Sequence, residues 1–271
     1  MARPVGFKAL ERYGRLANQL FQVAAVIGVA HTHGLPVALN PSWSYRPFFS
    51  VPDSHFSPKY RSATEFYEFP EVEHIDHRAR PYGQDPALFR DVADDVRLFF
   101  YPSPEAQSYL GWHSRWDGGI AVHVRRGDLL TQTPGFQPAL TVDAPDYYRT
   151  ALDVLDPMGV LPVVVFSDDP PWCAENQLEV FGRKVEVRQT KPRSHIPREY
   201  RNQPAMDWID LLLMGQFENM VISNSTYAVW AAYLSNAKNV LYPDLWYGPN
   251  LAHVNTELLF VDLPWRRVPC A

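Results

Sequence analysis

The sequence has few of the features that mark several common protein classes. It has two cysteines in 271 residues, too few for a disulfide framework or a four-thiolate metal site. Its apolar runs, such as residues 23–30, are much shorter than the roughly 18 residues that a membrane-spanning helix needs. Residues 1–9 have no hydrophobic core of a signal peptide. We therefore expect a soluble protein of a reducing compartment, with a cytoplasmic location.

The chain also lacks an excess of positive charge. It has 25 Lys and Arg against 30 Asp and Glu, a formal net charge of −5. Domains that neutralise nucleic-acid phosphates are usually basic, so we expect no nucleic-acid partner. Hydrophobic residues at 46% and charged residues at 20% exclude wholesale disorder. Proline outnumbers glycine by 25 to 14, which favours a compact chain with long rigid loops.

The first third of the chain begins with an alternation of strand and helix. Residues 5–10 form a mostly apolar run of strand length, and residues 16–31 place apolar side chains at the three- and four-residue spacing of a helix. Residues 35–39 then predict a second strand. Residues 41–115 are interrupted by prolines, so we expect irregular structure with short helices there.

Regular alternation returns in the second half and predicts a second α/β unit. Residues 161–166 are almost wholly apolar, as expected for a parallel strand covered by helices on both faces. The expected strands are 120–124, 161–166, 181–187, 220–223 and 240–242, and the expected helices are 145–154, 207–216 and 227–234. We place the two domains at residues 1–115 and 116–271, and expect ligands where strands end and helices begin.

The sharpest polar cluster follows the strand at 120–124. His123, Arg125, Arg126 and Asp128 stand there within six residues. Neighbouring strand residues point to opposite faces, so both arginines can aim at one ligand only if the strand has already turned. We expect one arginine to bind a phosphate and the other a structural carboxylate. The alternative is an ordinary surface arginine pair at a strand end.

Two further clusters lie where helices begin. Gly14, Arg15 and Asn18 open the first helix, whose free N–H groups favour anions, and Asn18 offers an amide suited to sugar hydroxyls. Asn18 fits a helix cap equally well. Residues 224–226 (Asn-Ser-Thr) stand between a strand and a helix, where hydroxyl and N–H groups can hold a diphosphate without metal. They too are common helix caps.

Asp168 and Asp169 form the last candidate cluster. Paired carboxylates at a strand end bind divalent metals in many phosphate-handling sites. The two prolines that follow them indicate instead a rigid loop whose acid orients an arginine or a sugar hydroxyl, and we favour that interpretation. The nine histidines show no metal-binding spacing, so we expect no metal site and no cofactor.

Taken together and in order, these segments resemble glycosyltransferase family 11, the α-1,2-fucosyltransferases. Residues 12–22 resemble the family's opening G-x-L-G-N-Q-[ML]-F-Q segment, and residues 123–128 match its H-x-R-R-x-D motif. Residues 223–234 resemble a late N-S-[ST]-F-S-W-W-x-A-W-L block, and Asp210 stands where the family carries an acid. Ala17, where the family has Gly, is a departure. The order of several motifs is more specific than any one of them.

The resemblance implies a GT-B-like α/β fold with two Rossmann-type halves and a cleft between them. The C-terminal half would bind GDP-fucose, and an oligosaccharide acceptor would enter from the N-terminal half. The implied reaction is an inverting, metal-independent transfer of L-fucose to the 2-hydroxyl of a galactose-type residue. The alternatives are fucosyl transfer to another glycan or protein hydroxyl, and an inactive nucleotide- or carbohydrate-binding module.

The resemblance also implies roles for individual residues. Arg125 or Arg126 would neutralise the β-phosphate, and Asp210 would accept N1–H and N2–H of the guanine, with His123 nearby. Asp128, and after it Asp168, is the candidate base for the acceptor hydroxyl, although Asp128 could instead hold an arginine. The full set of predicted donor-binding residues is Gly14, Arg15, His123, Arg125, Arg126, Asp168, Asp210, Asn224, Ser225 and Thr226, and the predicted catalytic residues are Asn18, Arg126 and Asp128.

Overall fold

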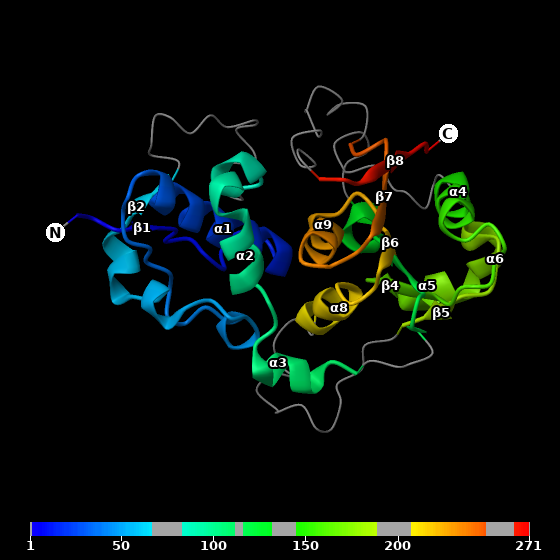
Figure 1. Ribbon diagram of the computed structural model, residues 1–271, viewed down its shortest axis with the longest axis horizontal. Coiled ribbons are helices and arrows are strands. Elements are labelled where there is room, and N and C mark those ends of the chain that lie inside the picture. Colours follow the sequence, from blue (N-terminus) through cyan, green and yellow to red (C-terminus); the bar gives the residue numbers. More distant parts are fainter. Residues whose placement is uncertain are drawn as a thin grey trace. The chain divides into compact units, whose positions relative to one another are not determined.

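The computed structural model describes residues 2–66, 83–111, 116–131, 145–188, 207–247 and 263–270 (Figure 1). The described residues up to Tyr109 form one compact unit, and those from Leu110 onward form a second. Each unit combines helices with parallel strand pairs. The α/β class predicted from the sequence is therefore confirmed.

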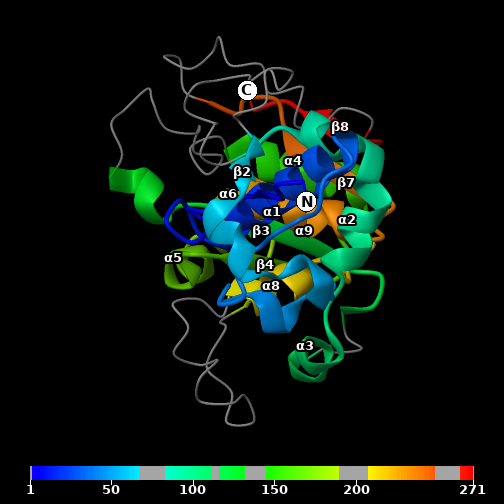
Figure 2. The same ribbon diagram turned by 90° about the vertical axis from the view of Figure 1, so that its left-hand side faces the viewer.

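The first unit is built around one buried helix, α1. Its elements are β1 (Val5–Gly6), α1 (Leu16–Thr32), η1 (Arg46–Phe48), η2 (Asp53–His55), η3 (Pro58–Ser62), β2 (Thr64–Glu65), η5 (Pro86–Val92), α2 (Ala93–Phe99) and α3 (Pro104–Tyr109). Nearly every residue of α1 is buried, which is typical of a helix that other elements surround. The paired strands β1 and β2 lie beside it (Figures 1 and 2).

A glycine allows η5 to pack closely on α1. A Cβ atom at Gly28 would lie 1.9 Å from the carbonyl oxygen of Leu88, so no other residue fits at that crossing. The strand predicted at residues 5–10 extends only over Val5–Gly6, and the strand predicted at residues 35–39 is reduced to single bridges at Val37 and Leu39. This unit therefore has a smaller sheet among its described residues than the sequence pattern indicated.

The second unit contains a six-stranded, wholly parallel sheet in the order β5-β4-β3-β6-β7-β8. Its elements are β3 (Ile120–Val124), η7 (Gly127–Thr131), α4 (Pro145–Leu155), β4 (Val163–Ser167), α5 (Pro170–Glu175), α6 (Gln177–Phe181), β5 (Glu186–Val187), α8 (Asp207–Met214), β6 (Asn219–Val221), α9 (Thr226–Tyr233), β7 (Asn239–Pro243) and β8 (Arg266–Val268). Helices α4, α5 and α6 lie on one side of the sheet and α8 and α9 on the other (Figure 1). Burial on both faces explains why β3 and β4 consist mostly of apolar side chains.

The sheet has one topological switch point. From β3 the chain adds β4 and then β5 on one side, and it returns to β3's other side with β6. Connections leaving β3 and β6 therefore run in opposite directions. Open α/β sheets generally bind ligands at the carboxyl ends of the strands at such a switch point.

Two predicted elements are wrong in their extent. The strand expected at 181–187 is only Glu186–Val187, because the preceding residues form α6, which Gly182 ends in a left-handed conformation (φ 68°). The expected loop after β4 is instead the start of α5, with Asp169 as its N-cap and prolines in its first turn. Proline at the first helical position is a known helix-start signal, and it could have predicted α5.

His123 joins the two strands of the switch point. Its side chain is buried, and Nδ1 lies 2.7 Å from Oγ of Ser223, which follows β6. Its ring lies 5.4 Å from that of Tyr227 on α9. Burial, together with the charge of Arg125, lowers the pKa of His123 to about 3. The imidazole is therefore neutral at every pH at which the protein is expected to work.

The lowered pKa of His123 predicts an acid-dependent loss of stability. Between pH 6.5 and 3 the unfolded chain binds a proton at this position and the folded chain does not, so stability falls as the pH is lowered. From pH 6 to 4, the unfolding free energy of the wild type should fall by about 1 kcal/mol per pH unit more than that of His123→Asn. Urea unfolding at a series of pH values measures the unfolding free energy of both proteins. The contributions of the carboxylates cancel in the difference, because both proteins contain them. Parallel curves would show that His123 is protonated in the folded state.

Candidate functional site

The carboxyl edge of the large sheet collects polar residues from four neighbouring strands. Arg125 and Arg126 follow β3, residues 167–169 end β4, Arg188 follows β5, and residues 223–225 follow β6. Because all these strands are parallel, their ends meet at one edge. The sequence-based prediction that the clusters lie at strand ends is confirmed for this unit.

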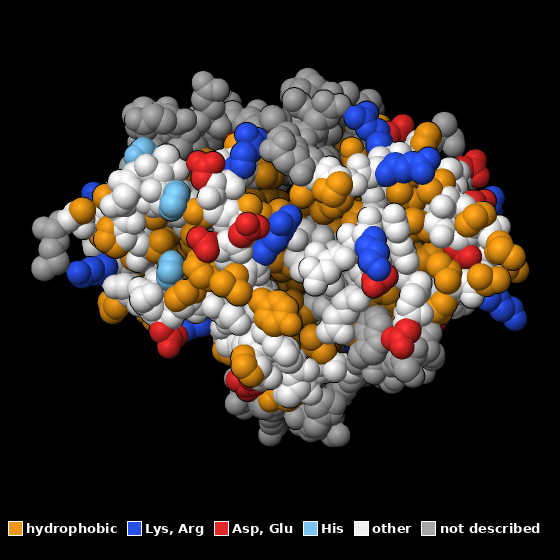
Figure 3. All heavy atoms as spheres, in the orientation of Figure 1, with side chains coloured by type: hydrophobic (Ala, Val, Ile, Leu, Met, Phe, Trp, Pro, Cys, Tyr) orange, Lys and Arg blue, Asp and Glu red, His pale blue; other side chains and the backbone are white. Residues whose placement is uncertain are grey.

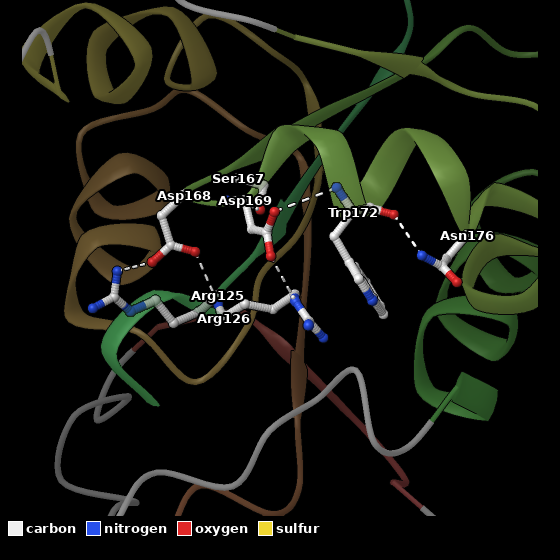
Figure 4. Close-up of polar contacts among 7 residues, drawn as sticks. All are labelled: Arg125, Arg126, Ser167, Asp168, Asp169, Trp172 and Asn176. Carbon is white, nitrogen blue, oxygen red and sulfur yellow. Dashed lines mark hydrogen bonds and ion pairs between the residues drawn. The ribbon is translucent and has the colours of Figure 1, made fainter. Parts of the chain in front are cut away.

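The two arginines after β3 are matched by the two aspartates after β4 (Figure 4). Arg125 forms an ion pair through Nη1 with Asp168, whose other oxygen accepts a hydrogen bond from the backbone N–H of Arg126 at 2.8 Å. Nε of Arg126 lies 3.1 Å from Oδ2 of Asp169. Both arginines, rather than one, therefore have a carboxylate partner.

Arg126 is held on a second side by an aromatic ring. Its guanidinium carbon lies 3.7 Å from the ring centroid of Trp172 on α5 (Figure 4). Its terminal amino groups make no hydrogen bond or ion pair with any residue of the described part. Arg126 can therefore present two N–H donors in a fixed plane, the geometry that suits phosphate oxygens.

Small polar residues stand at the end of β6, beside the switch point. Ser225 is the N-cap residue of α9 and its side chain makes no capping hydrogen bond, so its hydroxyl is available at the helix start. Thr226 is the first residue of α9 and is half-buried like Ser225. Asn224 is 2% exposed and donates to the carbonyl of Trp246 at 2.9 Å. Its amide is bonded within the unit, and contact of Asn224 with a ligand stays a prediction.

Asp210 has a partner that the sequence pattern did not reveal. Nε of Arg188 lies 2.6 Å from its Oδ1, and the arginine side chain is only 8% exposed. The guanidinium of Arg188 also lies 5.8 Å from the ring centroid of Trp116 and 5.9 Å from that of Phe166. Arg188 follows a two-residue strand with no motif around it, so no sequence signal pointed to it.

These residues form a row along the face of the sheet that α8 covers. Phe166 on β4 is the register partner of His123 on β3. Beyond Phe166 lie Arg188 and Asp210, on the side of the sheet away from β6. The row therefore extends from the switch point towards the β5 edge.

Gly14, Arg15 and Asn18 form a separate group in the first unit. Gly14 has φ 75°, and a Cβ atom there would lie 2.2 Å from Nδ2 of Asn18. Oδ1 of Asn18 accepts from Nε2 of Gln84 at 2.8 Å. The N-cap residue of α1 is the exposed Arg15, with no side-chain capping bond. The interpretation of Asn18 as the helix cap is therefore wrong.

Two predictions about acids and metals remain open. Asp128 lies in η7, and its side chain is outside the described part of the structure, so its role as a base stays a prediction. Within the described residues, no group of three or more His, Cys, Asp or Glu side chains could hold a metal ion.

None of the described helices has the length and apolar character needed to cross a bilayer. On the face drawn in Figure 3, the described basic side chains occur in small groups among acidic and apolar ones.

The chain is similar to mammalian enzymes named galactoside alpha-(1,2)-fucosyltransferase 1. It is 26% identical to the human protein over 253 residues, which is 84% of this chain and 65% of that protein. It is 27% identical over 251 residues to the protein from Plecturocebus brunneus, with the same shares of each chain. The chain therefore spans 65% of the length of these curated relatives.

Among solved structures, the chain is similar to NodZ, an alpha-1,6-fucosyltransferase soaked with GDP-fucose. The TM-score is 0.48 at 15% sequence identity, covering 86% of this chain and 90% of that one. NodZ from Bradyrhizobium gives the same TM-score and identity.

The family model described as glycosyl transferase family 11 matches residues 84–246, which include β3, β4, β6 and the clusters at their ends. The chain belongs to glycosyl transferase family 11.

Proposed function

We propose that this protein is an inverting, metal-independent fucosyltransferase that moves L-fucose from GDP-fucose to the 2-hydroxyl of a galactose-type residue on a glycan. Membership of glycosyl transferase family 11 and the names of the relatives support fucosyl transfer and the α-1,2 linkage. The observation that carries the proposal is the fixed guanidinium of Arg126 at the ligand-binding edge of the sheet.

The diphosphate of the donor binds at the switch point between β3 and β6. Arg126 offers N–H donors from the β3 end, and Ser225 and Thr226 offer hydroxyl and backbone N–H groups at the start of α9. As GDP leaves, negative charge grows on the β-phosphate while the sugar becomes oxocarbenium-like. Donors that are already in place stabilise this charge where it develops, which is the task a metal ion performs in other transferases.

The guanine lies along the row that runs from His123 towards the β5 edge. Neighbouring strands are about 4.8 Å apart, so β5 lies about 10 Å from β3, and an extended nucleotide can reach Asp210 from the switch point. A carboxylate at that position accepts the guanine N1–H and N2–H together. Arg188 holds one oxygen of Asp210 and so fixes the plane of the carboxylate.

The acceptor hydroxyl needs a base when it attacks the sugar. Both oxygens of Asp168 already accept hydrogen bonds, from Arg125 and from the backbone of Arg126. Asp168 is therefore poorly placed to take a proton, which favours Asp128 as the base. Contact of Asn18 and Arg15 with the fucose or the acceptor stays a prediction.

The proposal predicts transfer without added metal. Incubation with GDP-fucose and a panel of galactosides should give an α-1,2-linked product, identified by NMR, and EDTA should leave the rate unchanged. Transfer of fucose to another hydroxyl would support the assignment of GDP-fucose as donor and contradict the assignment of the 2-hydroxyl as acceptor. GDP binding without turnover on any glycan would contradict the proposal and favour a binding module. Loss of activity in EDTA that Mn²⁺ restores would contradict metal independence.

The guanine assignment predicts a selective effect on donor affinity. Asp210→Asn removes one acceptor for paired N–H groups, so KM for GDP-fucose should rise about tenfold while kcat changes less. Arg183→Met is the control. Arg183 forms an ion pair with Asp156 at 2.6 Å, the same distance as between Arg188 and Asp210, and we place Arg183 and Asp156 outside the site. An unchanged donor KM in Asp210→Asn, or an equal rise in the control, would reject the guanine role.

A further inference from the structure

We infer that Trp172 and Asp169 are positioning residues that hold Arg126 for recognition of the β-phosphate. This inference rests on the proposed function, and it concerns residues that the sequence motifs did not connect with the donor. The three side chains form a clamp, defined here as Arg126 with Trp172 on its face and Asp169 at its Nε (Figure 4).

The clamp leaves one edge of the guanidinium for a ligand. Trp172 lies against its face at 3.7 Å, and Asp169 takes Nε–H at 3.1 Å. The two terminal amino groups have no partner within the described part. The side chain of Arg126 is only 14% exposed. The clamp therefore leaves the terminal amino groups little freedom to move at the ligand-binding edge of the sheet.

Both clamp residues are themselves fixed by local structure. Asp169 is the N-cap of α5 and accepts the backbone N–H of Trp172 at 3.3 Å. Its own N–H donates to Oγ of Ser167 at 3.0 Å. The prolines in the first turn of α5 restrict the backbone between the two residues, and Asn176 donates to the carbonyl of Trp172 at 2.8 Å. The β4–α5 turn therefore delivers a carboxylate and a ring to the same arginine.

This arrangement reduces the cost of binding a phosphate. A free arginine side chain has several rotatable bonds, and their freedom is lost when it binds. A clamped guanidinium has lost much of that freedom on folding, so its donors meet the β-phosphate already oriented. The carboxylate of Asp169 also offsets the charge of Arg126 when no nucleotide is bound.

If the clamp positions Arg126, variants that break it should discriminate less well between GDP and GMP, which differ by the β-phosphate. The dissociation constants of both nucleotides are measured by calorimetry for the wild type, Trp172→Leu, Trp172→Phe and Asp169→Asn. We expect Trp172→Leu to weaken GDP about tenfold and GMP much less, and Trp172→Phe to restore most of the difference because it keeps an aromatic face. Asp169→Asn keeps the shape and should lower the GDP preference in the same direction.

Two further variants separate positioning from general damage. In an Arg126→Met background Trp172→Leu should have no further effect on the ratio of the two constants, because the tryptophan acts through the arginine. Phe56→Leu is the matched control. Phe56 lies 4.2 Å from the guanidinium of Arg46, which is paired with Asp53 at 2.7 Å, so the variant removes the same kind of contact in the first unit and should leave the GDP-to-GMP ratio unchanged.

An unchanged ratio in both Trp172→Leu and Asp169→Asn would overturn the inference, as would an effect of Trp172→Leu that persists without Arg126. Since nucleotide binding is measured without an acceptor, these results do not depend on fucose transfer. A protein with the expected ratios but no transferase activity would support the clamp and contradict the proposed function. A wild type that binds GDP and GMP equally would contradict the clamp even if it transfers fucose.

Discussion

The pairing of two consecutive arginines with two consecutive aspartates is the interaction on which the candidate site depends. Arg125 and Arg126 leave β3 where Asp168 and Asp169 leave β4, and the two strands are neighbours in register. Each guanidinium therefore has a counter-charge before any ligand arrives, and the turns after both strands are fixed to each other. The charges at this edge are balanced when it is empty, and the phosphate that we propose it binds would meet donors that need no rearrangement.

The switch point of the sheet determines where that edge can act. β6 lies on the other side of β3 from β4, and it brings the start of α9 to the same edge of the sheet as the arginines. The buried, neutral His123 joins β3 to Ser223 without adding a charge of its own. Positive groups and helix N–H donors therefore share one edge of the sheet, while Asp210 and Arg188 lie along the sheet towards β5. This separation suits a ligand with an anionic end and a polar aromatic end.

Much of this site could be predicted from the sequence, because strand ends carry a local signal. An apolar run that ends in Arg125-Arg126 or in Asp168-Asp169 identifies both a strand and its polar edge. The prediction that an acid of the loop after β4 orients an arginine is confirmed. Which arginine it meets could not be predicted, because pairing depends on strand order. Arg188 meets Asp210 only through a two-residue strand and a helix far along the chain. Trp172 was missed because its helix was taken for a loop, although Asp169 and two prolines mark the helix start.

A crystal structure of the protein with GDP tests the central claim most directly. The account predicts that the β-phosphate contacts the terminal amino groups of Arg126, between the end of β3 and the start of α9, with the guanine towards Asp210. A diphosphate bound away from residues 123–126 and 224–226 would contradict it.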